Sequence, residues 1–64
     1  MTEKELLYLE DAIGHENNII NIIYNLLDCV EDKGISLFLD KEIKKHQAFV
    51  SKLVNVLEGM SSEW

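Results

Sequence analysis

The amino-acid sequence predicts an all-α protein, an antiparallel two-helix hairpin that homodimerises into a four-helix bundle. Each half of the chain has apolar residues at steps of three and four, which is the pattern of a helix with one apolar side. A short acidic segment containing one glycine separates the halves, and no proline interrupts either of them. The 64 residues are therefore expected to form one domain, residues 1–64.

The first helix is expected over about residues 3–31. Thr2 and Glu5 have the spacing of a capping box, in which each side chain accepts a hydrogen bond from the other residue's backbone amide. One member of the apolar stripe is ionisable, and it is Glu16. The stripe consists of Leu6, Leu9, Ile13, Glu16, Ile20, Ile23, Leu27 and Val30.

The turn between the helices is expected over about residues 32–36. Gly34 is the residue expected to end the first helix, since glycine readily takes the left-handed conformation found after helix C-termini. Ser36 is then the expected N-cap of a second helix over about residues 37–58. A turn this short requires the two helices to lie antiparallel.

The second helix carries two polar residues, Glu42 and His46, on its apolar side. The apolar members of this stripe are Leu39, Ile43, Phe49, Val50, Leu53, Val56, Leu57 and Met60. Gly59 is the expected stop signal, followed by a polar tail over residues 59–64. Trp64 in this tail is expected to fray unless a second subunit covers it.

A second apolar row on the first helix predicts self-association. It comprises Tyr8, Ala12, Ile19, Ile22 and Leu26, with Cys29 at its margin. One partner helix covers only one stripe, and a domain of this size has little core of its own. A homodimer is therefore expected, and a higher oligomer stays open.

Composition excludes several classes of function. The net charge of −6, with no arginine, argues against nucleic-acid binding, and no apolar run approaches the length of a membrane span. The single Cys29 and the absence of a basic, apolar leader favour a reducing, cytoplasmic location. Phosphate-binding loops and nucleophile motifs are missing, so the sequence names no substrate and leaves enzymatic activity undecided.

Glu16, Glu42 and His46 are the candidate metal ligands. A twofold axis would double them into four carboxylates and two imidazoles, a set that suits iron, manganese or zinc inside a four-helix bundle. The alternative is a metal-free ion pair between Glu42 and His46, with Glu16 reaching solvent or a partner's lysine. His15 is a weaker candidate ligand, and the alternative is a half-buried or interface histidine. Cys29 is expected to be a small apolar filler.

A turn near Gly34 would place these ligands at different depths. Glu16 is farther from Gly34 along the chain than either Glu42 or His46 is. At the helical rise per residue, the resulting offset is roughly 9 to 15 Å along the helix axis. A crosswise dimer would bring Glu16 of one chain level with Glu42 and His46 of the other, and would form two symmetry-related sites instead of one shared centre.

Two segments resemble small ferritin-like proteins of spore-forming Firmicutes, akin to the spore coat protein F family. They are Glu5-Leu-Leu-Tyr-Leu-Glu-Asp-Ala-Ile-Gly-His-Glu16 and Lys41-Glu-Ile-Lys-Lys-His46. The resemblance implies a ferritin-like bundle, a link to sporulation, and a forespore or spore-coat location. Carried over by position, Glu16 is the first-helix ligand, and Glu42 with His46 is the second-helix pair, spaced by four residues where Glu-x-x-His is usual.

A second, weaker resemblance is to sporulation phosphatases that are also helical hairpins. Their Ser-x-Glu-Leu-Asp motif is replaced here by Ser36-Leu-Phe-Leu-Asp40. Two hypotheses of function follow. The first is a ferritin-like metal-binding protein, and the second is a metal-free assembly or partner-binding protein, such as a coat component or a sporulation regulator.

Overall fold

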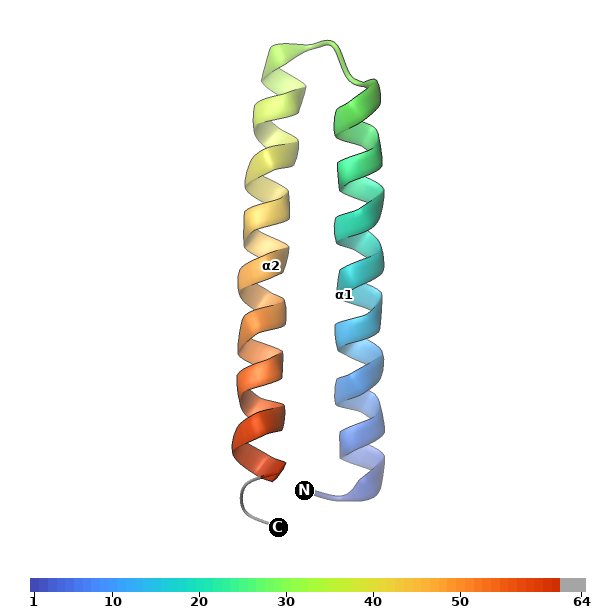
Figure 1. Ribbon diagram of the computed structural model, residues 1–64, viewed down its shortest axis with the longest axis vertical. Helices are drawn as coiled ribbons and strands as arrows, with labels where there is room; N and C mark the ends of the chain where they lie inside the picture. Colours follow the sequence, from blue (N-terminus) through green and yellow to red (C-terminus); the bar gives the residue numbers. More distant parts are fainter. Residues whose placement is uncertain (62–64) are drawn as a thin grey trace.

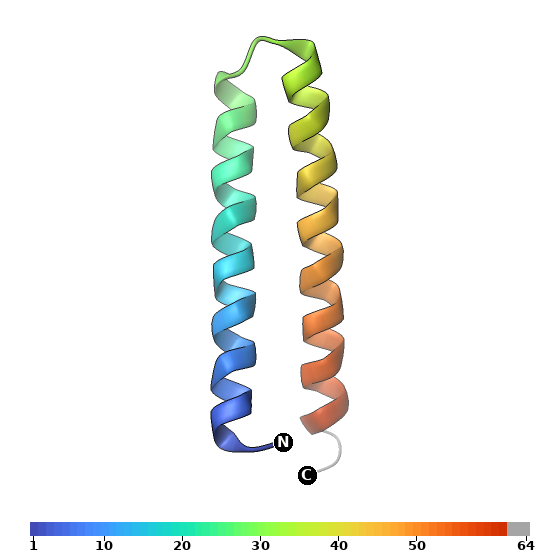
Figure 2. The same ribbon diagram turned by 180° about the vertical axis from the view of Figure 1, so that it is seen from behind.

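The computed structural model describes the backbone of residues 1–61 and the side chains of residues 1–59. Two helices, α1 (Glu3–Cys29) and α2 (Lys33–Ser61), lie side by side and antiparallel (Figures 1 and 2). The hairpin measures 49 × 15 × 11 Å. Over residues 1–61 the structure is entirely helical apart from its ends and one loop, which confirms the predicted hairpin. Neither helix, within the described part, combines the length and apolar character that a bilayer span requires.

The N-terminus of α1 has the predicted capping box. The Glu5 amide donates to Thr2 Oγ1 at 3.1 Å, and the Thr2 amide donates to Glu5 Oε1 at 3.3 Å. The Thr2 hydroxyl also donates to Glu5 Oε1 at 2.9 Å. The hydroxyl and then the backbone hydrogen bond from Thr2 lower the pKa of the Glu5 carboxyl from its ordinary 4.5, because they favour the ionised form.

Replacing Thr2 with valine is expected to raise the pKa of Glu5 toward its ordinary value. A carboxyl whose pKa is lowered by folding stabilises the cap above about pH 4.5, and this stabilisation disappears as the pH falls through the lower, folded-state value. An NMR titration that follows the Glu5 side-chain carbon measures the pKa of Glu5 in the parent and in Thr2→Val. An unchanged Glu5 pKa in Thr2→Val would show that the Thr2 hydroxyl does not cause the shift.

The loop is shorter than predicted and lies earlier in the chain. α1 ends at Cys29, and the Val30 amide closes it by donating to the Leu26 carbonyl at 3.0 Å. α2 already begins at Lys33, because Asp32 accepts the Ile35 amide at Oδ1 (2.9 Å) and the Ser36 amide at its carbonyl (3.0 Å). Asp32 is therefore the N-cap of α2.

Two predictions about this loop were wrong. Gly34 does not end α1, and no glycine in the described part has a positive φ. Ser36 is not the N-cap of α2 but lies one turn inside the helix. Asp32 and Gly34 are competing signals two residues apart, and the carboxylate cap prevails because aspartate is among the best N-cap residues.

α2 also continues beyond the predicted stop. Gly59 lies within the helix, which extends to Ser61 rather than residue 58. An exposed glycine costs a helix about 1 kcal/mol relative to alanine, which a helix of 29 residues tolerates. Residues 62–64, including the predicted fraying of Trp64, lie outside the described residues.

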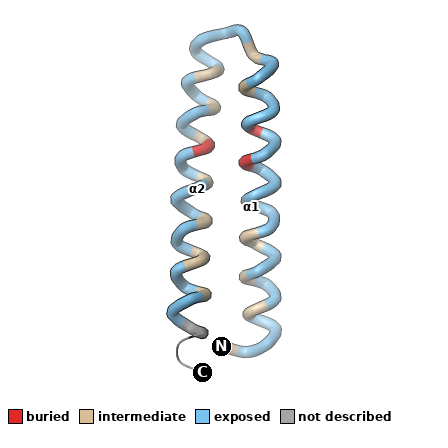
Figure 3. The backbone as a smooth tube through the Cα atoms, in the orientation of Figure 1, coloured by how far each residue is buried: buried red, intermediate tan, exposed pale blue. Residues whose placement is uncertain are grey.

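The core of the hairpin is small. Its three buried side chains in residues 1–59 are Ile20, Ile23 and Ile43, and Leu27, Leu39 and Val50 pack against them. Figure 3 shows that the buried positions face each other across the helices, in the half nearer the loop. All six belong to the two predicted stripes, so the 3-4 spacing identified the contact surface correctly.

Candidate functional site

Glu16 and His46 lie at the same level, in the middle of the hairpin. Glu31 is the centre of the loop, and Glu16 and His46 are equally far from it along the chain, one before it and one after it. The predicted offset of roughly 9 to 15 Å within one hairpin was therefore wrong for this pair. The error came from placing the turn at Gly34, three residues too late, which shifts the register of the whole second helix.

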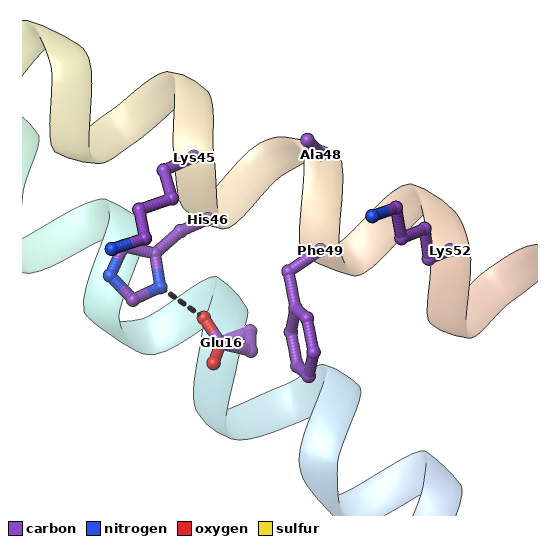
Figure 4. Close-up of a pocket in the computed structure, with 6 residues that line it drawn as sticks. All are labelled: Glu16, Lys45, His46, Ala48, Phe49 and Lys52. Carbon is purple, nitrogen blue, oxygen red and sulfur yellow. Dashed lines mark hydrogen bonds and ion pairs between the residues drawn. The ribbon is translucent and has the colours of Figure 1, made fainter.

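His46 lies between two carboxylates. Its Nδ1 and Glu16 Oε2 are 2.5 Å apart, a hydrogen bond that joins α1 to α2 (Figure 4). Its Nε2 lies 3.7 Å from Glu42 Oε2, one turn earlier on α2. The side chains of Glu16, His46 and Glu42 are 18%, 26% and 29% exposed, so the group is shielded from most of the surrounding water.

The three side chains do not converge on one point. Glu16 takes the Nδ1 edge of the imidazole, whereas Glu42 faces the Nε2 edge, and the two nitrogens of this ring point in different directions. Accordingly, the described residues contain no group of three His, Cys, Asp or Glu side chains arranged to hold a metal ion. In a single hairpin, the pair that faces a common space is Glu42 and His46 Nε2.

His15 and Cys29 lie apart from this cluster. Both side chains are exposed in the hairpin, and His15 is adjacent in sequence to Glu16 but on a different side of α1. In a single hairpin Cys29 therefore fills no gap, contrary to the prediction that it is an apolar filler. Either residue would be covered only by a second molecule.

An open groove of about 430 Å³ adjoins the cluster. Glu16 and His46 form one side of it, and the ring of Phe49 extends from α2 toward α1 beside Glu16 (Figure 4). Lys45 and Lys52 lie along the same stretch of α2 and, with Ala48, complete the lining. The 3-4 spacing predicted Phe49 only as a packing residue and did not predict the groove. Its position three residues after His46 puts the two on neighbouring sides of the helix.

A polar contact on the other side of the hairpin was not predicted from the sequence either. Gln47 Nε2 donates to the Tyr24 hydroxyl at 3.3 Å and links α2 to α1. The pairing depends on the register of the helices, which the sequence alone had misplaced.

Comparison of the chain with models of protein families finds no match, and comparisons with curated proteins and with solved structures find none either. The resemblance to ferritin-like coat proteins consequently depends on the quoted segments alone. The case for any function must come from the geometry of the cluster and of the surface around it.

Proposed function

We propose that this protein is a small ferritin-like metal-binding protein whose metal is held by Glu42 and His46 and supported by Glu16. The observation that carries the proposal is the His46 ring between two carboxylates, half-buried at the centre of an otherwise apolar seam. Carboxylate oxygen and neutral imidazole suit iron, manganese or zinc. The resemblance to coat proteins adds a sporulation setting to this proposal.

The space between His46 Nε2 and Glu42 suits a cation. When Nδ1–H donates to Glu16, a neutral ring presents its lone pair at Nε2, toward a second acceptor 3.7 Å away. A cation placed between these two acceptors would be attracted to both of them. With metal–ligand bonds of about 2.0 to 2.2 Å, two ligands of a tetrahedral ion lie roughly 3.3 to 3.6 Å apart, close to the observed separation.

Glu16 acts in this proposal through His46. A carboxylate that accepts the Nδ1–H of a histidine fixes the tautomer and makes Nε2 a better ligand. The resemblance assigned Glu16 to the metal itself, whereas its position on the Nδ1 edge favours the supporting role within one hairpin. Water or a second subunit must supply the remaining ligands, since two are too few for a stable site.

Metal analysis of the purified protein tests the proposal. After dialysis against iron, manganese or zinc and removal of excess metal, the parent is expected to retain metal in near-stoichiometric amounts. Glu42→Ala and His46→Ala are expected to retain none, because each removes one of the two ligands. Glu42→Gln is the conservative variant, which keeps the shape of the side chain but not its charge.

Asp40→Ala is the matched control for this experiment. Asp40 is an exposed carboxylate on the same helix that pairs with Lys44, one turn later, at 3.3 Å. It precedes Glu42 by two residues and so lies on a different side of α2. This variant is expected to bind metal like the parent. Absence of metal from the folded parent, or equal metal in Glu42→Gln and the parent, would contradict the proposal.

The second candidate function is a metal-free assembly or partner-binding protein. The observation that favours it is the number of large apolar side chains left exposed by the hairpin, which include Tyr8, Ile22 and Phe38, each about 60% exposed. Exposed apolar surface of this extent marks an interaction site. Under this proposal Glu16, Glu42 and His46 only pair with one another, and the parent protein retains no metal.

A further inference from the structure

The hairpin has one apolar face, to which both helices contribute. One groove on it is lined by Tyr8 and Ala12 of α1 together with Val56 of α2, and the groove at the central cluster by Glu16 of α1 and Phe49 of α2. The second apolar row of α1 thus lies on the same side as an equivalent row of α2. The exposed large residues of this apolar face are Tyr8, Ile19, Ile22, Leu26, Ile35, Phe38, Phe49 and Val56.

The opposite side of the hairpin is polar. On α1, Tyr24 follows Ile22 by two residues, and on α2, Gln47 precedes Phe49 by two residues. A step of two residues places side chains roughly 160° apart around a helix. They hydrogen-bond to each other across the hairpin, so they mark a side distinct from the apolar face. The described part of the molecule is thus two-sided, and only one side is suited to packing.

The chain exposes more surface than a compact monomer of its mass, and the difference is about the area of one interface. The chain exposes 5013 Å², whereas a compact monomer of 7.4 kDa is expected to expose about 4200 Å². The excess, roughly 800 Å², is the area that each partner buries in a typical stable complex. A face of 49 × 15 Å has an area of roughly 700 Å² in projection, which is close to this excess.

Charge distinguishes the two ways in which two copies can meet face to face. α1 has six acidic residues and one lysine, a net charge of −5, and α2 has five lysines and three acidic residues, a net charge of +2. With both loops at the same end, α1 of each copy packs against α2 of the other. With the loops at opposite ends, α1 packs against α1 and α2 against α2.

Individual charges favour the arrangement with both loops at one end. Asp11 and Lys52 are almost equally far from Glu31 along the chain, so Asp11 would lie nearly level with the partner's Lys52. In the opposite arrangement the two α2 helices run antiparallel about their midpoints, near residue 47, and Lys41 lies nearly level with the partner's Lys52. Like charges at the same level of an interface repel each other, so this arrangement is disfavoured.

We infer that the occupant of the apolar face is a second copy of the chain, packed with both loops at the same end. Glu16 is the middle residue of α1, and His46 directly precedes the middle residue of α2. Each Glu16 then lies level with the partner's His46 and about one turn farther from the loops than the partner's Glu42, which brings both clusters to the centre of one bundle. The inference completes the ligand set of the proposed function but does not require a metal.

A nitroxide label on the native Cys29 tests this arrangement. Cys29 is exposed and is the last residue of α1, next to the loop. With both loops at one end, the two labels are separated only across the bundle, which gives a distance below about 30 Å. With loops at opposite ends they are at least about 39 Å apart along the axis. Double electron–electron resonance measures the distance, and light scattering on the labelled sample measures the mass.

Each outcome decides one question. A dimer with a short label distance is the expected result. A dimer with a label distance of about 40 Å or more would overturn the arrangement, and a folded monomer would overturn self-association through this face. Neither result depends on metal content, so failure of this inference is distinct from failure of the metal proposal.

In a charge-reversal series, Asp11→Lys is expected to weaken the dimer and Asp11→Lys with Lys52→Asp to restore it.

Discussion

Ile43→Ala is expected to unfold most of the protein at 25 °C. Ile43 is the most buried side chain in the described part of the molecule, 3% exposed, and contacts the isoleucines of α1 at the centre of the core. Replacing a buried isoleucine with alanine costs about 2–5 kcal/mol, while a core of this size supplies only about 3–5 kcal/mol. Circular dichroism during urea unfolding measures the change.

Leu37→Ala is the control for this prediction. Leu37 is also an aliphatic residue of α2, but it is 61% exposed and does not belong to the apolar face or the core. Its replacement is expected to change the free energy of unfolding by no more than about 0.5 kcal/mol. Equal destabilisation by the two variants would show that the stability of the hairpin does not reside in the Ile20, Ile23 and Ile43 core.

The sequence predicted the helices and their contact stripes because those features are periodic and local. Thr2 with Glu5 specifies the first cap within four residues, and the spacing of Ile20, Ile23 and Leu27 specifies which side of α1 is buried. Neither depends on the rest of the chain. The same holds for the prediction that Glu16 and His46 lie on the contact sides of their helices.

The register between the two helices, which decides which residues of α1 and α2 lie side by side, is not local in this sense. It depends on where the chain turns, and there Asp32 and Gly34 give contradictory signals over three residues. A three-residue error in the position of the turn lengthens one arm of the hairpin by three residues and shortens the other by three. The level of paired residues therefore shifts by six residues, about 9 Å along the axis. The contact of Glu16 with His46 was lost from the prediction for this reason, together with that of Tyr24 with Gln47. Short turns with two capping signals limit any prediction of a site shared by two helices.

Replacing Glu16, Glu42 and His46 together by leucine is expected to stabilise the metal-free protein. These side chains interrupt an apolar seam, and replacing a buried ionic group by apolar residues often stabilises a protein by about 1–4 kcal/mol. Because the three are 18–29% exposed, we expect the lower end, about 1 kcal/mol. For a domain of this size, that corresponds to a rise in Tm of roughly 4–8 °C.

Without metal the leucine variant is expected to be more stable than the parent, and metal is expected to make the parent the more stable of the two. A ligand that binds only the folded state stabilises it by about 2.7 kcal/mol at a hundred times its Kd, so the parent gains this amount and the leucine variant gains nothing. The Tm of the parent should then exceed that of the variant at the same protein concentration, whereas without metal it should be lower. If the variant stays more stable with and without iron, manganese or zinc, the cluster is a structural ion-pair group. A crossing of the two stabilities would show instead that the polar residues are retained for the ion, since in its absence they only weaken the bundle.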